Sequence, residues 1–424
     1  MKTKLSLFFV VLIISQNIFS QEPTVTTNIS ELEETGNFQE ALIQVKKLLE
    51  TDSLNENLWV KAAQLYCSKQ QYKLSIAAYE KAFKIIPSNH KYLLFLAKSN
   101  KLAGNKDLSI KLYKDFLQFE PFNIMALSEL ATNYILGNQT DSAAATYKKL
   151  YLLDTSNVDY LQKWASNQWA SGQTIEAFIN FKKAYKMDST YLPVVFDLAK
   201  IYVNKKRQDS AIAILKMNII VSPIENRLYA DLGTAFFSKG DYTQAIPEYE
   251  KAIEFGYKGT EAFKRLGISY YSVAKYDKSK QMLELLIVKD TADYKVCLYL
   301  GNIYNYYNKP EKAIVFLNKA IVLLLPDPLV VSAVYTSLID SYRATHDYKE
   351  LINVLVKRND NMPQHYRSPE YLYEIANVYE DDLKNKEKAL FYYQEYYKVI
   401  KDLTYNQEIK VNVLSKINAL NAIK

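Results

Sequence analysis

Glycine and proline are scarce in this chain, with only 10 and 11 copies in 424 residues. An all-β protein needs these residues at its many turns, and nucleotide-binding folds need glycine-rich loops, so both classes are disfavoured. Extensive disorder is also excluded, because 49% of the residues are hydrophobic and only 23% are charged. A folded chain of this length is expected to contain two or three domains.

Arginine is equally rare, since only six of the 53 basic residues are Arg, and the formal net charge is +7. A protein that reads bases or grips phosphates usually shows clustered arginines. The lysines here are spread along the chain. We therefore expect a solvated surface of mixed charge and no nucleic-acid partner.

Residues suited to catalysis are few. The three histidines, His90, His346 and His365, have no partner at the helical spacing of a metal pair, and no HExxH, CxxC, GxSxG or phosphate-loop motif occurs. The acidic runs at 31–34 and 380–382 are expected to be solvated, on a degenerate helix and in a loop, rather than paired catalytic acids. The sequence therefore predicts no enzyme, no cofactor and no metal site.

The first twenty residues have the pattern of a secretory signal peptide. Lys2 and Lys4 give a positive start, Leu5–Ile14 is an apolar core, and a more polar tail ends at Ser20, where cleavage is expected. An uncleaved anchor is the alternative, although such a short core cannot span a bilayer. Since the longest later apolar stretch, 320–325, is also short, we expect an exported chain without a transmembrane segment, in the periplasm or at the cell surface.

A sequence period of about 34 residues runs through most of the chain. One series at this spacing is always small: Ala41, Ser75, Ser109, Ala143, Ala177, Ala211, Ala245, Ser279 and Ala313. A second is Ala or Gly: Ala63, Ala97, Ala131, Ala165, Ala199, Gly233, Gly267 and Gly301. A third is aromatic or Leu: Tyr79, Tyr113, Tyr147, Phe181, Leu215, Tyr249, Leu283 and Leu317. Four glycines recur at twice the period: Gly36, Gly104, Gly172 and Gly240.

Each repeat has the apolar spacing of two short helices. Small residues are expected where two helices cross closely, and large ones fill the space between neighbouring pairs. Gly near the middle of a repeat supplies the left-handed backbone that ends the first helix. Cys67 and Cys297 lie about seven repeats apart, and each repeat of a stack contacts only its neighbours, so both are expected to be free, partly buried thiols.

These features resemble the tetratricopeptide repeat (TPR), a helix–turn–helix of the same period, whose best copies here begin at Trp59 and Leu232. The resemblance implies an all-α solenoid of about eleven repeats that forms a right-handed superhelix. The expected division is a signal peptide (1–20), a worn first repeat (21–55), eight in-register repeats (56–327), two divergent repeats with short insertions (328–402) and a C-terminal capping helix (403–424).

Local departures from the pattern carry expectations of their own. Pro247 lies inside a second helix, which should begin late or bend. Leu351 stands where the other repeats have a small residue, and the loop of the last repeat is longer by one residue. In the capping helix, we expect Ile409, Val413, Ile417 and Leu420 to be buried and Lys410, Asn412, Lys416 and Asn421 to face water.

The resemblance also implies a binding surface, because the first helices of TPR proteins line a concave groove. One offset along these helices carries apolar and aromatic residues: Ile135, Trp169, Val203, Phe237 and Tyr271. Basic residues lie at the other offsets, among them Lys200, Arg227 and Lys264. An aromatic ribbon flanked by positive charge suits an extended peptide or an acidic glycan. The alternative is that these aromatics only pack on the next helix.

One specialised TPR function is disfavoured. Family members that bind chaperones hold a C-terminal carboxylate with Lys and Asn on consecutive repeats, but Ile268 stands where the Asn would follow Lys264, and Leu298 stands where the Lys would accompany Asn302. We therefore expect an exported scaffold or adaptor that binds a protein or peptide partner through its groove. A polysaccharide- or peptidoglycan-binding module is the alternative.

Overall fold

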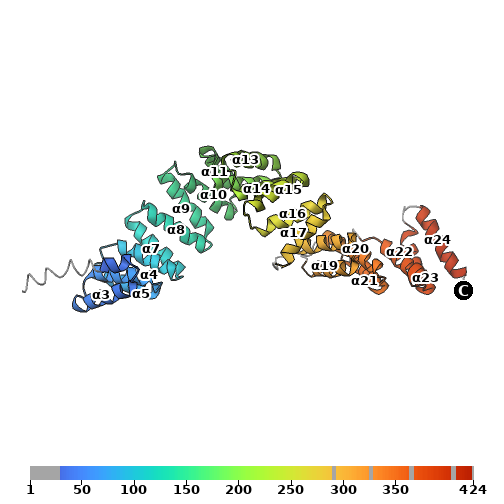
Figure 1. Cartoon of the computed structure of the whole chain (residues 1–424), viewed down its shortest axis with the longest axis horizontal. Coiled ribbons are helices and arrows are strands. Elements are labelled where there is room, and N and C mark those ends of the chain that lie inside the picture. Colours follow the sequence, from blue (N-terminus) through green and yellow to red (C-terminus); the bar gives the residue numbers. More distant parts are fainter. Residues whose placement is uncertain (1–28, 289–292, 324–327, 362–366, 403–406, 423–424) are drawn as a thin grey trace, which may run out of the picture. The chain divides into compact units, whose positions relative to one another are not determined.

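The computed structural model describes residues 29–288, 293–323, 328–361, 367–402 and 407–422. The expected signal peptide and His365 lie outside these residues. The described chain is built from helices joined by short turns (Figure 1), which confirms the all-α prediction. It divides into two compact units, Met1–Ile201 and Tyr202–Lys424, called here the N-terminal and C-terminal units, and each is described by itself.

Helices alternate between a first and a second helix of each repeat, and over most of the chain both kinds begin at the interval that the sequence period predicts. The first helices are α4 (Glu56–Ser68), α6 (Lys91–Leu102), α8 (Ile124–Leu136), α10 (Val158–Ala170), α12 (Leu192–Asn204), α14 (Asn226–Lys239), α16 (Thr260–Ser272), α18 (Tyr294–Tyr306), α20 (Pro328–Ala344) and α22 (Glu370–Asn377). The second helices are α3 (Phe38–Thr51), α5 (Tyr72–Ile85), α7 (Lys106–Phe119), α9 (Thr140–Leu153), α11 (Thr174–Met187), α13 (Gln208–Val221), α15 (Tyr242–Glu254), α17 (Tyr276–Val288), α19 (Pro310–Leu323), α21 (Tyr348–Asp360) and α23 (Lys386–Ile400).

Several first helices begin at a side-chain cap that recurs with the repeat. The carboxamide oxygens of Asn55, Asn123 and Asn157 accept hydrogen bonds from backbone N–H groups three residues later, at the starts of α4, α8 and α10. Such caps satisfy backbone donors that have no partner inside the helix. The caps therefore fix where each of these helices starts relative to the preceding repeat.

Within each repeat, the two helices cross where a small residue meets a large one. A Cβ atom added to Gly233 would lie 2.9 Å from the Tyr249 ring, and one added to Gly301 would lie 2.5 Å from Cγ of Leu317. The Ala residues of the same series, such as Ala97, are fully buried. The crossing leaves room for no more than a methyl group in the Ala repeats and for none in these Gly repeats.

We predict that Gly267→Leu destabilises the C-terminal unit by about 1–3 kcal/mol or more, because added atoms overpack a filled crossing. Even a Cβ there would lie 2.6 Å from Cδ2 of Leu283. The same change at Gly137, where the nearest atom to a new Cβ is 3.4 Å away, is the control and should cost much less. Thermal unfolding of both variants checks this, and an unchanged melt of the Gly267 variant would show that the crossing is placed wrongly.

The turn between the two helices of a repeat contains one left-handed residue. The four glycines at twice the period have positive φ, as expected: Gly36, Gly104, Gly172 and Gly240. Other residues take the same conformation at the same position of the remaining repeats: Gln70, Asn138, Lys206, Ala274, Asn308, His346 and Lys384. The turn geometry is therefore common to every described repeat, although only some of them have the residue that favours it.

Replacing a non-glycine residue at this left-handed position with glycine should stabilise the fold. Ala274 has a φ of 59° and is exposed, and a left-handed conformation costs a residue with a Cβ about 1–2 kcal/mol. We predict that Ala274→Gly raises the free energy of unfolding by up to about 1 kcal/mol, because this gain exceeds the additional backbone entropy that glycine loses on folding. Gly240→Ala, the reverse change, should lower it, as measured by denaturant unfolding. Equal and unchanged midpoints for both would contradict the assignment.

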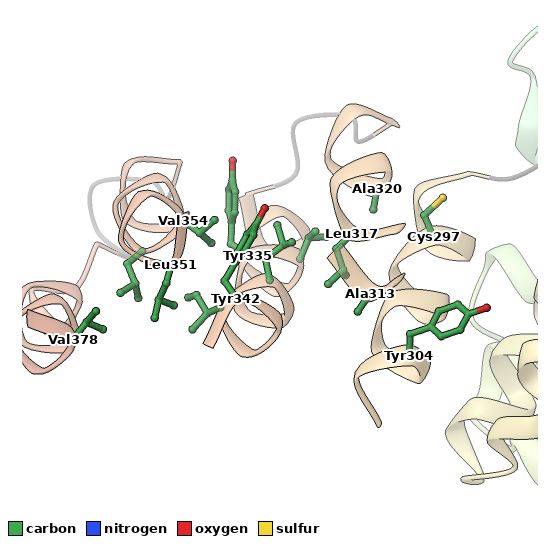
Figure 2. Close-up of a cluster of buried hydrophobic side chains, with 14 of the residues drawn as sticks. Cys297, Tyr304, Ala313, Leu317, Ala320, Tyr335, Tyr342, Leu351, Val354 and Val378 are labelled. Carbon is green, nitrogen blue, oxygen red and sulfur yellow. The ribbon is translucent and has the colours of Figure 1, made fainter. Parts of the chain in front are cut away.

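Buried side chains form clusters between successive helices rather than one central core. Figure 2 shows the cluster that gathers residues of α18, α19, α20 and α21, including Cys297, Leu317, Tyr342 and Leu351. Leu351, which replaces a small residue, is fully buried there. Both cysteines are free thiols, and Cys67 is partly buried while Cys297 is fully buried, so that burial raises the pKa of the Cys297 thiol.

Two expectations about helices are revised. Of the two alternatives for the helix with Pro247, the late start is wrong, because α15 starts at Tyr242 and Asp241 caps it by accepting from the Gln244 N–H, and the bend stays a prediction. The extra residue of the last repeat does not lengthen a loop. It lies in a π-helical turn, Val378–Asp382, that continues α22, and the Leu383 N–H bonds to the Val378 carbonyl. A π-turn absorbs one additional residue without breaking the helix.

The π-turn brings Glu380 into a polar cluster with the capping helix α24 (Gln407–Ala422). The Glu380 carboxylate accepts from the Tyr393 hydroxyl at 2.6 Å and from Lys416 Nζ at 2.7 Å. Tyr393 is fully buried and Lys416 is 27% exposed. The expectations that Glu380 is solvated and that Lys416 faces water were therefore wrong, because each is the other's partner; Lys410 is also half-buried.

The apolar side of the capping helix is as predicted, since Val413, Ile417 and Leu420 are buried and Ile409 packs against them. The polar cluster adds an ionic contact to this apolar one. Burial raises the pKa of Glu380, but the hydrogen bonds from Lys416 and Tyr393 outweigh it and leave the pKa below its ordinary value. The ionised form of Glu380 is thus the one that stabilises the attachment of α24.

We predict that Glu380→Gln lowers stability by about 1–3 kcal/mol near neutral pH, because Lys416 loses its partner. A carboxyl with a lowered pKa stabilises the fold above its unfolded-state pKa, and this contribution is lost as the pH falls through the folded-state value. The difference in melting temperature between wild type and variant should therefore shrink below about pH 4.5. Glu395→Gln, at the exposed pair with Lys398, is the control. A difference that persists in acid would contradict the ionic role.

Candidate functional site

The apolar candidate binding residues share one position, the twelfth of each repeat, near the end of the first helix. In the N-terminal unit this twelfth-position row consists of Cys67, Lys101, Ile135 and Trp169, and in the C-terminal unit of Val203, Phe237, Tyr271 and Asn305. Ile135 is 45% exposed, whereas Trp169, Val203, Phe237 and Tyr271 are half-buried. All five predicted apolar residues of the row are therefore partly accessible to solvent.

In the C-terminal unit, the aromatics of the row contact neighbouring side chains. The Phe237 ring meets the edge of Tyr242, with centroids 5.4 Å apart, and the Arg265 guanidinium lies 5.7 Å from its centroid. Tyr271 packs edge-on against Tyr276 of its own repeat and against Tyr299 of the next, at 5.3 and 4.9 Å. Packing between helices thus accounts for part of the surface of both rings.

Asn305 ends the row with polar contacts to the following first helix. Its Nδ2 donates to the Ser337 carbonyl at 3.0 Å, and its Oδ1 accepts from the Ser341 hydroxyl at 2.8 Å. The side chain is committed to joining α18 and α20. The row therefore changes along the C-terminal unit from partly accessible aromatics to a structural amide.

In the N-terminal unit, Trp169 lies on the same helix as a polar cluster. Gln162 and Ser166 both donate to the Asp197 carboxylate, at 2.7 and 3.1 Å. One turn earlier, Asp159 accepts from the Tyr191 hydroxyl at 2.8 Å. The first-helix surface of this repeat therefore combines a half-buried indole with preorganised amide, hydroxyl and carboxylate groups, which is the mixture that recognises a peptide main chain and one large side chain.

The three predicted basic residues differ in how their charge is used. Lys200 is exposed, and Arg227, 51% exposed, lies 3.6 Å from Asp231. Lys264 is only 18% exposed and lies 2.6 Å from both Glu261 and Asp293. Burial lowers the pKa of Lys264, but its two carboxylate partners outweigh this and raise it above the ordinary value.

Two acids that pair with this basic flank, Asp231 and Asp293, do not lie at groove offsets. Asp293 comes from the loop before α18, and Asp231 lies one turn beyond Arg227, so neither occupies a groove position of its own repeat. In the N-terminal unit, Glu129 likewise pairs with Lys101 at 2.8 Å. The expected positive flank is thus largely neutralised by neighbouring carboxylates, and Lys200 contributes more free charge than Lys264.

Groups that could carry other chemistry have different environments. His90 stacks on Phe119, with ring centroids 3.5 Å apart, and His346 Nδ1 lies 2.8 Å from the Tyr348 hydroxyl. Within the described ranges, no set of three or more His, Cys, Asp or Glu side chains could hold a metal ion. In the same part of the chain, no helix is both long and apolar enough to cross a bilayer.

Comparison with known proteins bears on the architecture. A family model of the tetratricopeptide repeat matches residues 56–89 and 227–255, which are the repeats that begin with α4 and α14. The chain therefore contains tetratricopeptide repeats, and its stacked helical hairpins have the TPR-type architecture. Scaffolds of this kind are generally non-enzymatic and bind other proteins.

Individual relatives are similar to the chain at low identity or over a short segment. A segment of 74 residues is 36% identical to the BBSome complex member BBS4 of Bos taurus. This segment is 18% of this chain and 14% of that protein. A solved tetratricopeptide repeat protein from Parabacteroides merdae ATCC 43184 is 15% identical, with a TM-score of 0.42 over 69% of this chain and 98% of that one. MamA is 22% identical, with a TM-score of 0.36 over 40% and 93%.

Proposed function

We propose that this chain is an exported scaffold of the cell envelope that binds an extended segment of a protein partner on the surface formed by its first helices. The observation that carries the proposal is the composition of one face of α10, where the half-buried Trp169 follows Ser166 and Gln162 at helical spacing and both of these side chains donate to Asp197. Large aromatic side chains supported by fixed polar groups are the usual energetic centres of protein interfaces. Export rests on the sequence pattern of residues 1–20.

The partner is expected to lie along the twelfth-position row of the N-terminal unit rather than that of the C-terminal unit. Ile135 and Trp169 offer apolar area there, and the exposed Lys200 adds charge. In the C-terminal unit, Tyr271 and Asn305 are engaged by neighbouring helices. These residues therefore stabilise the repeat stack more than they contribute to binding.

We predict that Trp169→Ala weakens partner binding by about 2 kcal/mol, or roughly thirtyfold, with little change in melting temperature. Phe237→Ala should weaken binding less and lower the melting temperature, because its ring also packs on Tyr242. The partner is first isolated by cross-linking and pull-down from the native envelope fraction, and affinity and thermal unfolding are then measured on each variant.

Leu152→Ala serves as the control, since this side chain is 64% exposed on a second helix. It should change neither quantity. A destabilised Trp169→Ala protein with full partner affinity would show that the indole only packs. Recovery of the chain in the cytoplasmic fraction with residues 1–20 still attached would contradict export, and retention by an insoluble sugar polymer instead of a protein would overturn the choice of partner.

A further inference from the structure

Seven exposed lysines lie beyond the first turn of three successive second helices of the N-terminal unit. They are Lys111 and Lys114 of α7, Lys148 and Lys149 of α9, and Lys182, Lys183 and Lys186 of α11, called here the lysine face, and all are exposed. Lys114, Lys148 and Lys182 are each one repeat period apart and therefore occupy the same place on three consecutive helices. The lysines are thus not evenly spread, as the sequence suggested, but aligned by the repeat.

The charge of this face is not neutralised by the described chain. None of the seven ammonium groups lies within ion-pair distance of a carboxylate of the residues that the structure describes. The carboxylates that follow α9 and α11 are held in their own turns, since Asp154 accepts from the Ser156 hydroxyl at 2.6 Å and Asp188 from that of Thr190 at 2.7 Å. The face therefore carries an excess of positive charge, although Asp115 lies near Lys111 and Lys114 on α7.

Aromatic rings support several of these lysines without removing their charge. Lys183 Nζ lies 4.9 Å from the centroid of Tyr151, and Lys148 Nζ lies 5.6 Å from that of Trp164. The face of an aromatic ring attracts an ammonium group electrostatically, but the ring has no net charge and does not neutralise the ammonium group. The ammonium groups are thus restrained and still available to an anion.

A hollow of about 440 Å³ opens between α7 and α9 on this face. Lys114 and Gln118 line one side, Ser142 and Lys149 line the other, and Leu130 and Tyr134 of α8 form the floor. It lies wholly within the N-terminal unit. An apolar floor between two lysines suits a large apolar side chain flanked by carboxylates.

The hollow has a specific cause, which the C-terminal unit reveals. There, the Tyr304 hydroxyl donates to Glu284 of the preceding second helix at 2.7 Å, and Tyr270 bonds to Glu250 in the same way. The equivalent residues of the N-terminal unit are Tyr134 and Lys114, and an ammonium group cannot accept a hydrogen bond from a phenol. The Tyr–Glu bond that joins α15 to α16 and α17 to α18 is therefore replaced between α7 and α8 by an open, cationic site.

We propose that the lysine face is a second binding surface, which takes an acidic segment of a protein partner and seats one large apolar side chain in the hollow between α7 and α9. Charge complementarity identifies the acidic partner. The hollow favours a peptide over an anionic lipid surface, which would not insert a single side chain between two helices. The face carries no arginine for bidentate phosphate recognition, which disfavours nucleic acid.

The test uses the full mature chain and two short fluorescent peptides of Glu and Asp, one with a central Trp and one with a central Ala, in fluorescence anisotropy. The Trp peptide should bind several-fold more tightly, with an affinity that falls as salt is added. Lys114→Glu combined with Lys149→Glu should weaken it by at least about tenfold. The matched control is Lys319→Glu with Lys349→Glu, which makes the same charge change on exposed lysines of α19 and α21 and should have less than about a twofold effect.

A third variant separates the hollow from the charge. Ala145 is exposed and lines the hollow, so Ala145→Phe should fill it and abolish the preference for Trp over Ala while the salt dependence remains. Equal binding of both peptides by wild type, or equal losses in the two double variants, would overturn the proposal. So would binding of single-stranded DNA or anionic vesicles that is as tight as that of the Trp peptide and equally sensitive to Lys114 and Lys149. Trp169→Ala should retain peptide binding, which keeps this test independent of the first-helix surface.

Discussion

The close crossing of the two helices in each repeat is the constraint on which the other features depend. A glycine or alanine of the first helix lies against a large residue sixteen positions later, as with Gly267 and Leu283 or Gly301 and Leu317. That separation holds only if the turn between the helices keeps one length and one conformation. The left-handed residue of the turn therefore recurs even where it is Ala274 or Lys206 rather than glycine. Backbone strain at these turns is the cost of keeping the crossing in register.

The last repeat contains one additional residue between the crossing and the turn, which would otherwise shift this register. One additional residue separates the first helix from the left-handed Lys384, and the chain absorbs it as a π-turn rather than as a longer loop. Tyr393 thereby stays at its buried position in the crossing. The π-turn also moves Glu380 to where Lys416 of the capping helix reaches it. A local insertion has thus become the polar contact that attaches the C-terminal helix.

Sequence periodicity predicts the features of this fold that depend on neighbours in the same repeat. The small and large series, the glycine turns and the buried side of α24 all follow from spacing alone, because helices pack through residues at fixed intervals. Periodicity could not predict partners that come from other elements. Lys264 was expected to be a free groove cation, but Glu261 of its own helix and Asp293 of the next loop both pair with it, and the Asp293 contact does not follow from the repeat spacing. Glu380 was expected to be solvated for the same reason, since its partner lies on α24.

The candidate surfaces follow from which repeat positions the fold needs and which it leaves to solvent. Glu284 of the second helix α17 accepts a hydrogen bond from Tyr304, the eleventh residue of the next repeat. Lys312 lies 5.6 Å from the ring of the same tyrosine. Because Glu284 already bonds to Tyr304 of the next repeat, its carboxylate is not available to bind a partner. Where lysine replaces this glutamate, as at Lys114, no such bond to the tyrosine can form, and the lysine is exposed. In the same way, Tyr271 is held between helices whereas Ile135 of the same row is nearly half exposed. Lys114 and Ile135 are therefore side chains of the N-terminal unit that a partner can bind.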